Sequence, residues 1–253
     1  MFPQFLSPRG TALAVVALLV FAAPPAFADN EVEFRFAGVS SGKADDYRRH
    51  FMDALKKVRD FWGDTFQGKI IVDVSDGYRI SRAIVPAWRG EHGFMEMPAR
   101  RVQTDSAATT HELTHVFATN GNRFLAEGLA VYVHEKLGGA RAFPNFDEDL
   151  HRAAAPLTER ADLVALDKVS TPTPLSAVID EKEGYLIGGS FVRFLIEKRG
   201  GMENFRALYA LTPLIPHQRG GQSGDPARWE KIYGVPLAKL EAEWVAFLKA
   251  EFP

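Results

Sequence analysis

The stretch TTHELTHVFATNGNRFLAEGLAVYVHE, residues 109–135, predicts two helices joined by a tight turn. Apolar residues recur at helical spacing on both sides of the NGN sequence at 120–122, and Asn and Gly are typical of a chain reversal. In an α-helix, residues four positions apart project from the same face. We therefore expect the imidazoles of His111 and His115 to lie side by side, one turn apart.

The two histidines enclose Glu112 in the arrangement HExxH. Two imidazoles at this spacing can bind one zinc ion through one ring nitrogen each. Glu112 would lie beside the pair, where it can take a proton from a zinc-bound water. The alternative is a chance match, but apolar residues that include Leu113 and Val116 provide a buried side opposite the histidines. We expect Asp105 or Ser106 to cap this helix.

A catalytic zinc usually has three protein ligands and an open position for water. The third histidine of a metzincin would stand at position 121, which is Gly121, so that class is excluded. Glu127 is the better candidate, because the turn brings the second helix back past the histidines. The neighbours of Glu127 are apolar, and a carboxylate among them needs a partner. The alternative is that Glu127 is a solvated helix residue and not a ligand. Gly128 costs helix stability unless something packs close to it. We expect His134 to serve as a surface or supporting residue and not as a fourth ligand.

Residues 1–28 have the features of a signal peptide. Arg9 precedes an apolar run over 11–23, and the segment ends in the cleavage signal Ala-Phe-Ala. The run is shorter than the roughly 20 residues of a membrane helix, so an uncleaved anchor is the less favoured alternative. We expect a mature chain that starts at Asp29 and is exported, either periplasmic or secreted, with no stable membrane insertion.

Composition limits the chemistry and the partners. The chain has no cysteine, which excludes disulfides, a thiolate nucleophile and any Cys-ligated zinc. Removal of the signal segment takes away one basic residue and no acidic residue, so the net charge moves from −2 to −3. With this charge and no basic stretch, nucleic acid is not expected as a partner. The 19 Phe and four Trp supply a substantial core.

The periodicity of the sequence predicts an α+β fold in a single domain, residues 29–253. An N-terminal lobe, about 29–104, should hold a small mixed sheet and one helix, and a lobe over about 105–253 should be mainly helical. Strands are predicted at 31–36, 69–75, 79–88 and 92–97, with Val32, Phe34 and Phe36 on a buried face. Helices are predicted at 44–62, 105–119, 123–137, 146–155, 184–199, 202–211, 226–233 and 236–250.

The chain resembles the gluzincin metallopeptidases, the superfamily of thermolysin and aminopeptidase N, and in particular their compact peptidase MA-like members. HELTH at 111–115 and FLAEGLAVY at 124–132 are similar to the HExxH and W-L-x-E-G-L-A-x-Y segments, with Phe124 in place of the usual Trp. YLIGG from Tyr185 resembles the Y-x-K-G-A segment, although Ile187 replaces its Lys. The likeness covers roughly residues 105–250. Only eleven residues separate His115 from Glu127, where aminopeptidase relatives have a longer insertion.

The resemblance implies a thermolysin-like zincin fold, in which an edge strand beside the active-site helix holds extended substrate. HGFMEM at 92–97 is the candidate for that strand. Its GFMEM part is also similar to the GxMEN segment of aminopeptidases, whose glutamate binds a substrate amino terminus, but Met97 replaces the Asn. We expect Glu96 to be exposed on the strand surface. The resemblance gives Tyr185 the role of hydrogen-bonding the oxyanion, with core packing as the alternative.

Together these observations predict an exported metallopeptidase with one zinc ion on His111, His115 and Glu127. Glu112 would act as the general base and Tyr185 as the oxyanion donor, and the partner would be a peptide or protein substrate. Two alternatives stay open. The groove could bind peptide without cutting it, or the same groups could hydrolyse a nonprotein amide or ester.

Overall fold

The computed structural model describes residues 31–63, 65–84, 92–215 and 224–253. The predicted signal segment and the end of the predicted strand 79–88 lie outside these ranges. Within the described part of the chain, no helix combines the length and the apolar character that crossing a membrane requires.

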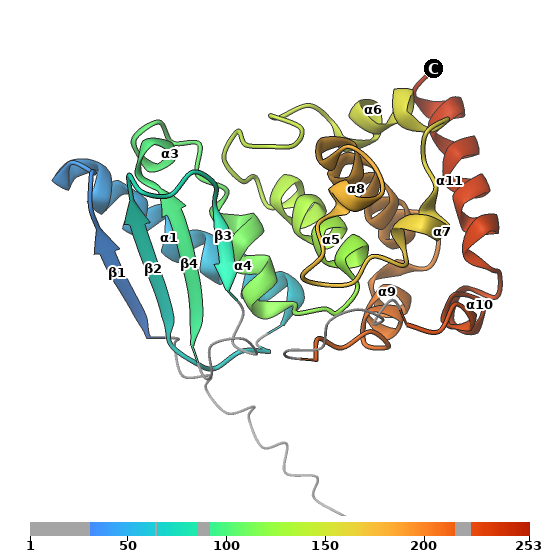
Figure 1. The fold of residues 1–253 in the computed structure, drawn as a ribbon, viewed down its shortest axis with the longest axis horizontal. Coiled ribbons are helices and arrows are strands. Elements are labelled where there is room, and N and C mark those ends of the chain that lie inside the picture. Colours follow the sequence, from blue (N-terminus) through green and yellow to red (C-terminus); the bar gives the residue numbers. More distant parts are fainter. Residues whose placement is uncertain (1–30, 64, 85–91, 216–223) are drawn as a thin grey trace, which may run out of the picture.

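A four-stranded sheet forms the N-terminal part of the molecule (Figure 1). The strands are β1 (Val32–Phe36), β2 (Ile70–Ser75), β3 (Arg82–Ile84) and β4 (Gly93–Pro98), in the order β1-β2-β4-β3. The first three in this order are parallel, and β3 pairs with β4 antiparallel, with Ala83 opposite Met95. The predicted mixed sheet is therefore present.

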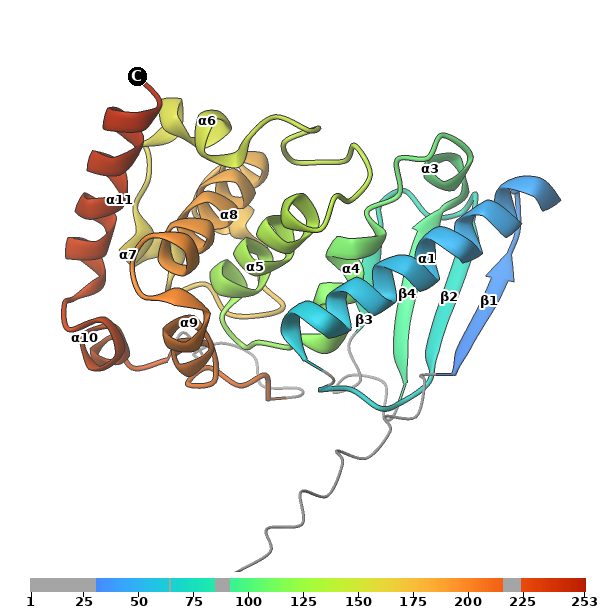
Figure 2. The same ribbon diagram turned by 180° about the vertical axis from the view of Figure 1, so that it is seen from behind.

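Helix α1 (Ser41–Trp62) lies across one face of this sheet (Figure 2). Its buried side follows the predicted spacing and includes Phe51, whose ring packs edge-on against Phe34 of β1 at 5.2 Å between centroids. Because β1 is an edge strand, Phe34 and Phe36 point toward the core but stay partly exposed. The prediction of which face of β1 points toward the core is confirmed. That face is less buried than expected.

Helices make up most of the rest of the chain, as predicted, with ends that differ by a few residues. The short helices α3 and α7 and two 3₁₀ turns, Ala155–Leu157 and Leu175–Ala177, were not predicted. The helices are α3 (Ala99–Gln103), α4 (Thr109–Phe117), α5 (Arg123–Lys136), α6 (Leu150–Ala154), α7 (Leu163–Leu166), α8 (Glu181–Glu197), α9 (Gly201–Tyr209), α10 (Ala227–Tyr233) and α11 (Leu237–Glu251). With a small sheet at one end and helices at the other, the fold class is α+β (Figure 1).

The edge strand next to the helices is β3, and the prediction of HGFMEM for this place is wrong. HGFMEM forms β4, which is an interior strand between β2 and β3. An interior strand has both backbone edges paired, so it has no free N–H and C=O groups for an added strand. β3 contacts α4 and lies between it and the rest of the sheet (Figure 1).

Candidate metal centre

Helix α4 carries the HELTH sequence and is almost entirely buried. It begins at Thr109 after Ala108, which has no side chain that could cap it, so the predicted cap by Asp105 or Ser106 is wrong. The reason is that Asp105 adopts a positive φ of 52° and pairs with Lys43 of α1, four residues before the helix starts. Packing against α1 and α5 holds α4 in place instead.

The turn between α4 and α5 is built from two buried asparagines. The Asn122 side chain accepts a hydrogen bond from Leu125 N at 2.9 Å and thereby caps α5. Asn120 accepts from Asn122 N at 2.8 Å and donates to the carbonyl of Tyr209 at 2.8 Å. Because buried polar groups with several partners hold one conformation, the turn fixes the start of α5 and, one turn later, Glu127.

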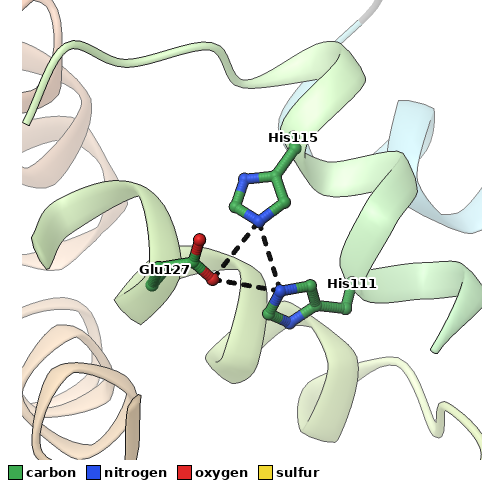
Figure 3. A group of neighbouring side chains, drawn as sticks. All are labelled: His111, His115 and Glu127. Carbon is green, nitrogen blue, oxygen red and sulfur yellow. Dashed lines mark hydrogen bonds and ion pairs between the residues drawn. The ribbon is translucent and has the colours of Figure 1, made fainter. Parts of the chain in front are cut away.

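The structure brings His111, His115 and Glu127 together (Figure 3). The two Nε2 atoms lie 3.2 Å apart, and Glu127 Oε2 lies 3.2 Å from His111 Nε2 and 3.4 Å from His115 Nε2. Glu127 is buried, at 1% exposed. The predicted tight loop does place this carboxylate over the histidines.

These separations fit one metal ion. Zinc takes nitrogen and oxygen ligands at about 2.0–2.2 Å in a tetrahedron, which puts neighbouring ligand atoms about 3.3 Å apart. Two imidazole nitrogens and a carboxylate oxygen suit zinc and other divalent transition metals. The cluster is therefore compatible with a single ion.

Glu112 is buried beside this cluster and next to β3. Burial raises the pKa of its carboxyl to about 7, while His111 opposes this rise and the nearby Glu127 carboxylate adds to it. The backbone N–H of Ala83 in β3 donates to the Glu112 carboxylate. The sheet edge therefore orients the Glu112 carboxylate beside His111.

Tyr185 lies in the first half of α8 and faces the histidines. Its ring stacks on His111, with 6.0 Å between centroids and 5° between ring planes. Burial, and then the Glu127 carboxylate, raise the pKa of the phenol far above its ordinary value, so it stays protonated. A protonated phenol beside the cluster can donate a hydrogen bond to a bound oxyanion.

His134 stands apart from the cluster, as predicted. It is buried, at 6% exposed, which excludes the surface role. Its Nε2 lies 2.7 Å from the carbonyl oxygen of Ala140, and burial lowers its pKa to about 4. His134 thus joins α5 to the following loop.

Glu96 is buried, at 8% exposed, and the expectation of an exposed strand residue is wrong. The cause is the interior position of β4, because Arg82 of the neighbouring β3 lies opposite Glu96 and pairs with its carboxylate. Its carboxylate accepts from Arg82 Nε at 2.9 Å. Being paired in this way, Glu96 is not among the residues that line the cavity at the cluster.

One residue that sequence reasoning missed also touches the cluster. Arg123, the first residue of α5, places Nη2 2.7 Å from Glu127 Oε1. The same atom lies 3.5 Å from Tyr185 Oη. The only sequence signal is a basic residue four positions before Glu127, a spacing at which helical side chains meet.

A cavity of about 490 Å³ opens onto the cluster, and a second of about 420 Å³ shares His111, Glu112 and Tyr185 with it. β3 lines the first cavity, and Phe143 contributes an apolar wall to the second. All predicted site residues except Glu127 and His115 line both spaces. Both cavities therefore border His111 and Glu112.

No protein-family model matches the chain, and no curated protein matches it in sequence. Among solved structures it is similar to a mutant M1 zinc metallopeptidase from Deinococcus radiodurans, with a TM-score of 0.43 and 16% sequence identity. The similarity covers 89% of this chain and 46% of that one, so the chain spans less than half the length of that protein.

Proposed function

We propose that this protein is an exported zinc-dependent peptidase. The observation that carries the proposal is the triangle of His111 Nε2, His115 Nε2 and Glu127 Oε2, with sides of 3.2 to 3.4 Å, next to a buried Glu112. Export rests on the signal-like sequence of residues 1–28. We assign the catalytic unit to the single domain 29–253.

Each side chain of the site has a distinct task. His111, His115 and Glu127 would hold the ion, which when bound polarises a carbonyl and lowers the pKa of water towards about 7. Glu112 takes the proton of the attacking water and passes it to the leaving amine. Tyr185 donates a hydrogen bond to the carbonyl oxygen as negative charge develops there.

The position of β3 at the edge of the sheet supports a peptide as the substrate. An extended chain can pair with exposed backbone groups of an edge strand. β3 lines the cavity that holds the cluster, so a peptide paired there would pass close to Glu112. A noncatalytic peptide-binding module has no need of a carboxylate base at this place. A nonprotein amide or ester would be hydrolysed by the same side chains but would not pair with β3.

Replacement of Glu112 by Gln tests the function. We expect Glu112→Gln to keep zinc and to lose hydrolysis of a mixed peptide library by about 10²–10⁴-fold, because one proton acceptor is removed. Cleavage products are measured by mass spectrometry, and zinc by elemental analysis. Glu203→Gln, the same change on an exposed residue of α9, is the control that should keep activity.

The outcomes separate the three candidate functions. Cleavage by the wild type that survives Glu112→Gln would contradict the mechanism. Zinc-loaded wild type that retains peptides without cutting them would be a binding module. Hydrolysis confined to nonpeptide amides or esters would assign the third function.

A further inference from the structure

Arg123 occupies the space between the third metal ligand and the catalytic tyrosine. Its Nη2 atom contacts Glu127 Oε1 at 2.7 Å and Tyr185 Oη at 3.5 Å. The side chain is 25% exposed, and it lines the cavity at the cluster. One guanidinium therefore joins two groups that come from different helices, α5 and α8.

We propose that Arg123 is a positioning residue that makes Glu127 a one-oxygen metal ligand and orients Tyr185 for catalysis. The inference rests on the proposed function, since it concerns the same metal and the same tyrosine. Arg123 itself touches neither the ion nor the reacting atoms in this arrangement.

The two oxygens of Glu127 face different partners. Oε2 lies 3.2 and 3.4 Å from the two histidine nitrogens, while Oε1 is bonded to Arg123. To bind a metal through both oxygens, Glu127 would have to turn and break its bond to the guanidinium. A ligand that uses one oxygen leaves a coordination position for water, as catalytic zinc sites require.

The buried setting makes this ion pair stronger than a pair on a helix surface. Exposed pairs at i, i+4 contribute little because solvent screens them. Here the Glu127 side chain is only 2% exposed, so a charge without a partner would be costly.

The contact with Tyr185 fixes the direction of the phenol proton. A guanidinium has only donors, so the phenol oxygen must accept from Arg123. The O–H of Tyr185 is then free to point away from Arg123 and to donate to substrate. The stacking of Tyr185 on His111 fixes the ring, and Arg123 fixes the hydroxyl.

Metal binding tests the first part of the proposal without use of activity. Zinc affinity of the full-length protein is measured by competition with a chromophoric chelator for wild type, Arg123→Met and Arg123→Lys. We expect Arg123→Met to lose about 10–100-fold in affinity, as removal of such supporting groups does. Arg123→Lys should recover part of this loss, because the charge remains but the planar fork is absent.

Cobalt substitution reports the coordination number directly. The visible absorption of Co²⁺ weakens as its coordination number rises, so Arg123→Met should show weaker bands than wild type when Glu127 binds through both oxygens. Arg82→Met is the matched control for both metal measurements, since Arg82 lines the same cavity but pairs with Glu96. Thermal unfolding of the metal-free variants checks that each is folded. If Arg123→Met does not fold, Arg123→Lys is compared with wild type instead.

A double-mutant cycle tests the link to Tyr185. Tyr185→Phe should reduce kcat much less in the Arg123→Met background than in wild type, because the hydroxyl is no longer oriented there. Additive effects on kcat would overturn this link. Zinc affinity within twofold of wild type together with unchanged Co²⁺ bands would overturn the role toward Glu127. A wild type that binds no zinc would instead overturn the proposed function, so the two failures are distinguishable.

Discussion

At the scale of single residues, Tyr185 has two separable contacts. Its ring stacks on His111, and its hydroxyl faces Arg123. Tyr185→Phe removes only the hydroxyl, so we expect kcat to fall by about 10²–10³-fold, the effect of losing one oxyanion donor. Zinc content and KM should change little, because the ring and the ligands stay. Steady-state kinetics with one cleaved peptide measures this, and an unchanged kcat would assign Tyr185 to packing alone.

The residues differ in how far their positions could be predicted from the sequence. His111 and His115 were predictable because helix geometry alone places residues i and i+4 on one face. Glu127 needed the turn to reverse the chain, and Asn120 and Asn122 were a sufficient signal for that. Arg123 was missed, since its role depends on a contact with α8 that no local pattern encodes.

At the scale of elements, the site depends on how closely α5 and α8 approach. A Cβ on Gly128 of α5 would lie 2.6 Å from the carbonyl oxygen of Gly188 and 2.8 Å from Val192 Cγ2 in α8. A glycine within a helix predicts that something packs close to it, and α8 packs close to Gly128 in the structure. This approach brings Glu127 on one helix near Tyr185 on the other.

Gly128→Ala should therefore push the two helices apart. A backbone carbonyl cannot yield as a flexible side chain can, so we expect a loss of roughly 1–3 kcal/mol in the free energy of unfolding. Zinc affinity should fall as well, because Glu127 moves with α5. Gly42→Ala is the control, since a Cβ there meets nothing within 4 Å and Ala favours the helix more than Gly, so stability should stay the same or rise slightly. Urea unfolding and chelator competition measure both effects. Wild-type stability in Gly128→Ala would mean that the helices have room to adjust.

The elements that were wrongly predicted share a dependence on distant pairing. The order of strands in a sheet is set by partners far along the chain, so HGFMEM could not be placed as interior β4 from its own residues. Glu96 was misjudged for the same reason. The start of α4 was misplaced because Asp105 pairs with Lys43 and does not cap the helix. Long amphipathic helices, in contrast, can be predicted from the spacing of apolar residues within the segment itself.

At the scale of the whole molecule, the site draws on both predicted lobes. β3 supplies the N–H that orients Glu112, and α5 and α8 supply Glu127 and Tyr185. A buried network ties the turn before α5 to the C-terminal helices, because Asp167 accepts from Asn122 at 3.0 Å and from Trp229 at 3.0 Å. The turn that positions Glu127 is thus held from outside α4 and α5, by Asp167 and through it by α10.

Acid sensitivity of this fold is expected from buried His151, which joins three helices. His151 Nδ1 of α6 lies 2.8 Å from Ser190 Oγ of α8, and Trp244 of α11 donates to the same oxygen at 3.0 Å. Burial, and then Arg193, lower the pKa of His151 to about 4. The folded pKa lies below the unfolded value of about 6.5, so the unfolded chain binds the extra proton between these values. Stability should be complete above about pH 6.5 and fall as the pH drops towards 4.

His151→Gln should remove this part of the pH dependence. The slope of unfolding free energy against pH between 6.5 and 4 should decrease by up to one proton, which is about 1.4 kcal/mol per pH unit. Both proteins are unfolded in urea with chelator present, so that proton-driven release of metal from the cluster does not contribute. His50→Gln on the exposed side of α1 controls for the substitution itself. Because slopes are compared and not absolute stabilities, a variant that is less stable overall still gives a valid test. Equal slopes for wild type and His151→Gln would show that His151 is not held neutral by the packing of α6, α8 and α11.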